Sequence, residues 1–109
     1  VVRQTGRLDQ AEALMAAYLA DWPDDLDMLN DLMVLQGERG RWTSAEQTAR
    51  QLVARAPESP RGWLGVAASR LKLGQPDRAR EALTDGLRVV TDPQGRVLLQ
   101  ANLNRLERS

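Results

Sequence analysis

The sequence contains no cysteine and no histidine among its 109 residues. Without them the chain has no disulfide framework, no thiol nucleophile, no imidazole base and none of the thiolate or imidazole ligands that transition metals prefer. Its serine and threonine hydroxyls have no histidine to activate them, and no glycine-rich phosphate loop occurs. The composition therefore predicts no cofactor and no metal, and it argues against an enzyme.

An excess of one charge sign and a long apolar run are also missing. Fifteen basic residues balance fifteen acidic ones, so no overall field would attract nucleic acid or an anionic membrane. No run of eighteen apolar residues occurs, so direct membrane insertion is not expected. Fourteen of the fifteen basic residues are arginine, a usage that resembles proteins of GC-rich bacteria. We expect a bacterial protein of cytoplasm or periplasm, with the periplasm favoured. Because the sequence starts VVRQTG without methionine, we also expect a fragment of a larger protein.

The sequence repeats itself with a period of 34 residues. Glycine, alanine and proline positions keep one register, namely Gly6, Gly40 and Gly74; Ala11, Ala45 and Ala79; and Pro23 and Pro57. Such self-similarity is the signature of a repeat architecture, in which each unit is one supersecondary element.

Start and stop signals divide each unit into two helices. Asp25, Ser59 and Asp92 stand at helix N-caps, and the last two precede a proline suited to the first helical position. Gly40 and Gly74 are placed to end the first helix of their units in the left-handed conformation. The second helix is expected to start with a Thr43–Glu46 capping box in one unit and with Pro76 in the first turn of the next. No segment alternates with period two, so no strand is predicted.

Two glycines and three tryptophans also bear on packing. Gly37 and Gly86 fall inside predicted helices, where close helix packing is expected to offset their poor helix propensity. Trp42 and Trp63 are expected to pack in the core. Trp22, beside Pro23, is the aromatic residue that we would first expect to touch a partner if it is exposed.

A helix, a tight turn and a second helix at this period resemble the tetratricopeptide repeat. The residues that carry the resemblance are Gly6, Ala11, Met15, Tyr18 and Pro23; Leu29, Leu32, Met33, Gly40, Ala45 and Pro57; and Trp63, Val66, Ala67, Gly74 and Ala79. The resemblance covers essentially the whole chain. It implies an all-α fold, a right-handed α-solenoid of antiparallel helix pairs in a single domain.

The units implied are 1–24 as the second half of a repeat, 25–58 and 59–92 as full repeats, and 93–109 as the first helix of a further repeat or a capping helix. The register of the last helix is open by one residue, because Pro60 and Pro93 are 33 residues apart. That helix has five large apolar residues to bury, Val97, Leu98, Leu99, Leu103 and Leu106. Both ends of the array are thus expected to be incomplete and capable of self-association.

In this family the first helices of stacked units line a concave groove that receives an extended peptide or a partner helix. The resemblance places these side chains in the groove: Asp27, Asn30, Asp31, Val34, Gly37, Glu38, Arg61, Leu64, Gly65, Ala68, Leu71 and Lys72. The acidic residues Asp27 and Asp31 either meet a basic partner or pair with Arg61 of the next helix. Asn30 is present, but Asp27 and Asp31 replace the basic residues of the family's chaperone-tail clamp, so that activity is not expected. The aspartate cluster in DWPDDLDMLND favours helix capping over a cation site, because it lacks the glycine and the alternating oxygen ligands of a calcium loop.

The function expected is a protein-interaction scaffold that binds a peptide or partner protein in the groove. The alternative is an architectural spacer or oligomerisation segment of a protein of cell-envelope assembly, secretion or exopolysaccharide export. Loss of partner binding on charge reversal at Asp27 and Asp31 would favour the scaffold. Loss of self-association on changes in the last helix would favour the alternative.

Overall fold

A computed structural model describes residues 2–108, with side chains from Gly6 onward. Six α-helices follow one another: α1 (Val2–Asp21), α2 (Leu26–Glu38), α3 (Trp42–Arg55), α4 (Pro60–Lys72), α5 (Pro76–Val89) and α6 (Pro93–Arg108). No strand occurs within these described residues. The all-α prediction is therefore confirmed.

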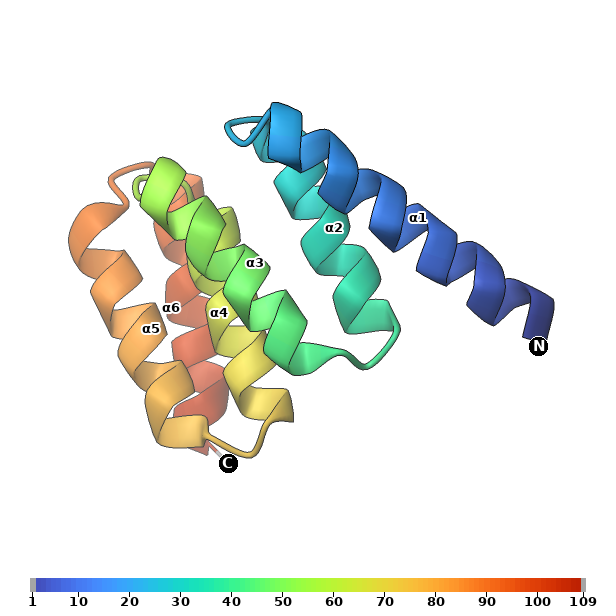
Figure 1. The fold of residues 1–109 in the computed structure, drawn as a ribbon. Helices are drawn as coiled ribbons and strands as arrows, with labels where there is room; N and C mark the ends of the chain where they lie inside the picture. The colour runs from blue at the N-terminus through green and yellow to red at the C-terminus, as the bar shows by residue number, and fades with distance from the viewer. Residues whose placement is uncertain (1, 109) are drawn as a thin grey trace.

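The helices form two rows (Figure 1). Each helix packs on its neighbours in sequence, and in addition α4 contacts both α2 and α6. In the described part of the chain, α1, α3 and α5 make no such contacts with one another. The even-numbered helices thus form an inner row and the odd-numbered helices an outer row, as expected for an α-solenoid of stacked hairpins.

The predicted caps define the helix ends. The carboxylate of Asp25 accepts a hydrogen bond from the Met28 N–H at 3.0 Å, and that of Asp92 accepts one from the Gly95 N–H at 2.9 Å. Ser59 accepts from the Arg61 N–H at 3.4 Å. After α2 and α4 the chain turns at Gly40 and Gly74, whose φ angles of 74° and 76° favour glycine over residues with a side chain.

The predicted capping box of Thr43 and Glu46 is wrong. Helix α3 begins at Trp42, and its N-cap, Arg41, makes no side-chain capping hydrogen bond. The reason lies in the tight turn at Gly40, where the Arg41 N–H donates to the Gln36 carbonyl at 2.8 Å and the helix restarts at the following residue. Thr43 therefore lies inside the first turn, and Glu46 is free to bind another unit.

Gly6 differs from its counterparts Gly40 and Gly74. It lies within α1 and has no positive φ, because this helix runs from Val2 without a turn. The repeat pattern placed a glycine here, but no described helix precedes α1 for the chain to fold back on. A Cβ at Gly6 would meet nothing within 4 Å.

Small residues hold the two rows together. Ala45, Ala49 and Ala79 are buried, as the family resemblance predicts. Gly37 and Gly86 are compensated by close packing, because a Cβ on them would lie 3.0 Å from the Trp42 ring and 2.8 Å from the Trp63 ring. Both tryptophans are half-buried; Trp63 packs against the main core and donates its indole N–H to the Pro57 carbonyl at 2.7 Å.

Equivalent glutamates connect consecutive units. Glu12 in α1 pairs with Arg39 at 2.7 Å, and Glu46 in α3 pairs with Arg70 in α4 at 3.0 Å. The side chains of both pairs are only 13–14% exposed, so solvent screens them weakly. Since Glu12 and Glu46 are one 34-residue period apart, the same type of contact fixes how each outer helix meets the next inner helix.

The register of α6 follows its cap. Gly95 and Leu99 are buried at the positions of Gly62 and Val66, 33 residues earlier. Leu103 is also buried and Leu106 is half-buried, but Val97 and Leu98 are exposed, so the expectation that α6 hides both of these is wrong. At that register they occupy positions equivalent to Leu64 and Gly65, on the side of the inner row assigned to the groove. We accordingly propose the units 25–58 and 59–92 for the pairs α2–α3 and α4–α5.

Candidate partner-binding groove

An apolar hollow of about 410 Å³ lies between α2 and α4, with the start of α3 as its floor. Its lining is Met33, Val34, Gly37, Glu38, Trp42, Ala45, Gly65, Ala68, Ser69 and Lys72. Glycine and alanine at four of these positions leave the space open. A Cβ at Gly65 would overlap the Met33 sulfur, so the approach of α4 to α2 depends on that glycine.

The hollow combines an apolar floor with a charged rim. Val34 is 46% exposed although its neighbours Met33 and Leu35 are more buried, so it offers apolar surface to a ligand. The Lys72 ammonium lies 5.8 Å from the Trp42 ring centre, within range of a cation–π contact. Glu38 supplies a carboxylate to the same lining. Such a hollow can hold an apolar side chain and select charges beside it, but its lining includes no nucleophile with an activating base.

The structure brings together part of the predicted groove set. Val34, Glu38, Ala68 and Lys72 line the hollow, while Leu64 is half-buried against the main core. Asp27 pairs with Arg61 at 3.4 Å near the starts of α2 and α4. Asp31 is exposed and Asn30 is half-buried, and neither lines the hollow.

The Asp27–Arg61 pair answers one question left open by the sequence. The two residues hold equivalent positions in consecutive units, and the pair forms between inner helices as the second interpretation required. Asp27 is nevertheless 88% exposed, so solvent weakens the pair and a charged ligand can displace it at little cost.

Sequence reasoning assigned no groove residues to α6. Pro93, Gln94, Val97 and Leu98 line an open hollow of about 460 Å³ on this helix. At the 33-residue spacing, three of them hold the positions of Arg61, Leu64 and Gly65 in α4, so they continue the inner row. The spacing between the two caps was the available signal, but only the structure shows that α6 follows it.

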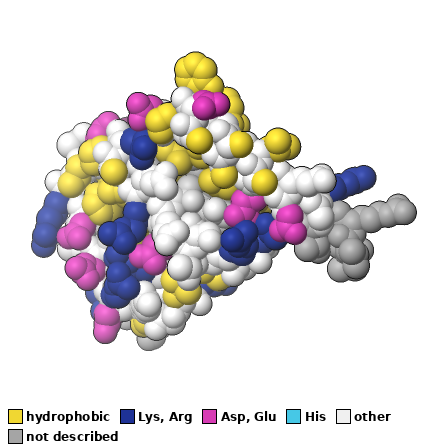
Figure 2. Space-filling view, in the orientation of Figure 1, with side chains coloured by type: hydrophobic (Ala, Val, Ile, Leu, Met, Phe, Trp, Pro, Cys, Tyr) yellow, Lys and Arg dark blue, Asp and Glu magenta, His cyan; other side chains and the backbone are white. Residues whose placement is uncertain are grey.

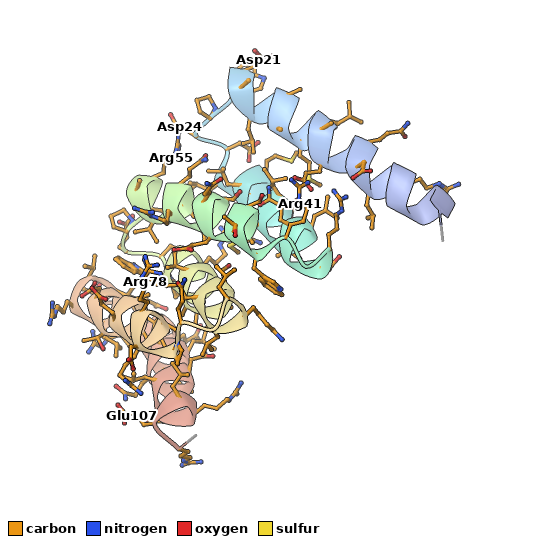
Figure 3. The ribbon with its side chains drawn as sticks, turned by 60° about the horizontal axis from the view of Figure 1, so that its bottom comes forward. Asp21, Asp24, Arg41, Arg55, Arg78 and Glu107 are labelled. Carbon is orange, nitrogen blue, oxygen red and sulfur yellow. The ribbon has the colours of Figure 1, made fainter. Side chains whose placement is uncertain are left out.

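The end of α1 forms a separate surface. Trp22 is largely exposed, and with Tyr18, Asp21, Pro23, Asp24 and Asp25 it lines a hollow away from the groove. The Tyr18 hydroxyl donates to Asp25 at 2.6 Å, which raises the pKa of Tyr18 and lowers the pKa of Asp25. Asp24 points toward Arg55 of α3 and pairs with it at 3.1 Å (Figure 3). Trp22 is thus exposed, as the condition attached to its prediction required, but it does not lie in the groove.

No cluster of acidic or other candidate ligands suited to a metal occurs in the described chain. Among the same residues, no helix is both long and apolar enough to cross a membrane.

Comparison with known families identifies the fold. A tetratricopeptide repeat family model matches residues 3–69, which include most of α1–α4. The chain belongs to the tetratricopeptide repeat family. Repeats of this family generally mediate protein–protein interactions and are typically non-catalytic scaffolds. No curated protein matches the chain.

Proposed function

We propose that this tetratricopeptide repeat chain binds a peptide or partner protein along its inner row, with one apolar side chain in the hollow between α2 and α4. The observation that supports the proposal is the combination of exposed Val34, an open floor at Gly65 and Ala68, and opposite charges on Glu38 and Lys72. An apolar anchor supplies most of the binding energy in such a hollow, and the rim charges select the residues beside it.

The ends of the inner row add charge selectivity to the proposed site. Asp27 and Asp31 present exposed carboxylates on α2, while Arg61 and Lys72 present cations on α4. A segment with a basic residue toward α2 and an acidic residue toward α4 is therefore the ligand chemistry that fits best. On α6, Val97 and Leu98 extend the apolar surface for a longer ligand.

A peptide-display selection tests the proposal. The chain is used to select peptides from a random library, and the affinity of the selected peptides is measured by calorimetry. Ala68→Glu places a charge in the hollow and should weaken binding at least tenfold. Ala54→Glu is the matched control, because Ala54 is also exposed but lies on outer helix α3.

Charge reversal at Asp27 and Asp31 should weaken binding of selected basic peptides and relax their selection. Failure to select any peptide, or equal binding to wild type and Ala68→Glu, would refute the groove as the binding site. Circular dichroism of each variant checks that the helices are retained.

A further inference from the structure

Helix α1 exposes a face that the other outer helices bury. Leu14 is 71% exposed, whereas Thr48 at the same repeat position of α3 is 4% exposed. Trp22 is 62% exposed, whereas its counterpart Ala56 is 7% exposed. On α3 the inner helix α2 covers this face, but α1 packs on α2 with a different side and contacts no other described helix. Figure 2 shows hydrophobic side chains along this edge of the molecule.

Charged residues stand at both ends of the exposed face. Arg7, Leu14 and Asp21 follow one another at seven-residue intervals, which places them on one side of a helix. Arg7 and Asp21 are both exposed, and Asp21 lies at the end of α1 (Figure 3). One end of the face is therefore basic, its centre is apolar and its other end is acidic.

This order is complementary to itself when a second α1 runs antiparallel. With Leu14 opposite Leu14 of the other copy, facing residues have sequence numbers that add up to about 28. Arg7 then faces Asp21, and Trp22 faces Gly6, where a side chain would meet only open space. Tyr18 falls near the small residue Ala11. Opposite charges and large-against-small packing thus occur together in one alignment.

We propose that two copies of this chain associate through antiparallel α1 helices, with Leu14 at the two-fold axis. This arrangement is isologous, so each copy contributes the same face and the assembly closes as a dimer. The hydrogen bond from Tyr18 to Asp25 holds the aromatic ring in place for the contact. The dimer lies on the outer row and leaves the hollow between α2 and α4 open, so it does not depend on the groove proposal.

The described residues disfavour a head-to-tail contact between α1 and α6. A sixth helix that covered α1 as α2 covers α3 would use the positions of Trp63 and Ala67, which in α6 are Arg96 and Gln100. Both are exposed and polar. Two copies of the α1 face bury apolar surface on both sides instead, so the symmetric pair has the larger hydrophobic gain.

Sedimentation equilibrium of the 109-residue chain tests the proposal over a wide concentration range. One helix pair buries less surface than most stable complexes, so we expect a weak monomer–dimer equilibrium. Leu14→Glu should raise the dimer dissociation constant at least tenfold, because it places two like charges at the axis. Ala20→Glu is the control, since Ala20 is exposed on the other side of the same helix.

A charge swap tests the antiparallel alignment. Arg7→Asp and Asp21→Arg should each weaken dimerisation, and the double variant should restore it. A chain that stays monomeric at all concentrations, or that dimerises unaffected by Leu14→Glu, overturns the proposal. Failure of the double variant to recover dimerisation overturns it as well, because a different face or orientation must then be used.

Discussion

Asp25 combines two structural roles in one exposed carboxylate. One oxygen caps α2 through the Met28 N–H, and the other accepts the Tyr18 hydroxyl of the preceding helix. Both hydrogen bonds favour the ionised form, so the pKa of Asp25 lies below its ordinary value, chiefly because of Tyr18. A single residue therefore fixes both the start of α2 and the end of α1.

This residue predicts a specific response to acid. A carboxyl whose pKa is depressed in the folded state stabilises it above the unfolded-state pKa of about 3.9 and loses that contribution as pH falls through the folded-state pKa. Tyr18→Phe removes the main cause of the shift, so it should reduce stability at neutral pH and flatten the decline below about pH 5. Urea unfolding across this pH range measures the effect. Parallel curves for wild type and variant would contradict it.

The conformation of Asp25 was accessible from sequence only in part. Its place before a run of apolar residues predicted the cap, which is a contact within one helical turn. The hydrogen bond with Tyr18 joins two helices, and its geometry depends on how α1 packs on α2. Trp42 and Trp63 show the same division: their burial beside Gly37 and Gly86 could be inferred, but the hollow over Trp42 required the position of Lys72.

At the scale of elements, the distance between α3 and α4 is set by residues without side chains. A Cβ at Gly62 would lie 2.8 Å from the backbone nitrogen of Val53, and this contact cannot be relieved by a rotamer change. The corresponding position in α6, Gly95, is buried against Val90 and Pro60. Close approach of one hairpin to the next is thus repeated along the array.

Gly62→Ala should therefore destabilise the chain by about 1–3 kcal/mol, although alanine favours helix. Gly6→Ala is the matched comparison, because Gly6 also lies in a helix but has open space around its Cα. This variant should be stabilising by about 0.5–1 kcal/mol. Urea midpoints at a protein concentration low enough to keep the chain monomeric provide the measurement. Equal effects at the two glycines would show that packing does not distinguish them.

Across the whole molecule, support is unequal from one end to the other. Helix α4 is flanked by α2, α3, α5 and α6, whereas α1 contacts only α2 within the described chain. In stacked repeats stability is approximately a sum over units and neighbouring interfaces, so a helix with a single neighbour opens most readily.

Amide hydrogen exchange should consequently be fastest in α1 and slowest in α4. Repeating the experiment at low and high protein concentration separates the two states of α1. If copies pair through this helix, its protection should rise with concentration while that of α4 stays constant. Slow exchange in α1 at low concentration would contradict the unequal support described above.

The sequence by itself determined the helix pairs, their capped starts, the turns at Gly40 and Gly74 and the family. These features depend on contacts within a few residues and on a period that the sequence repeats. The tertiary structure alone decided that Arg61 pairs with Asp27, that Val97 and Leu98 face outward, and that Leu14 lies uncovered. Burial of these side chains depends on which helices stand beside them, and equivalent positions in one repeat pattern have different neighbours at the middle and at the ends of the array.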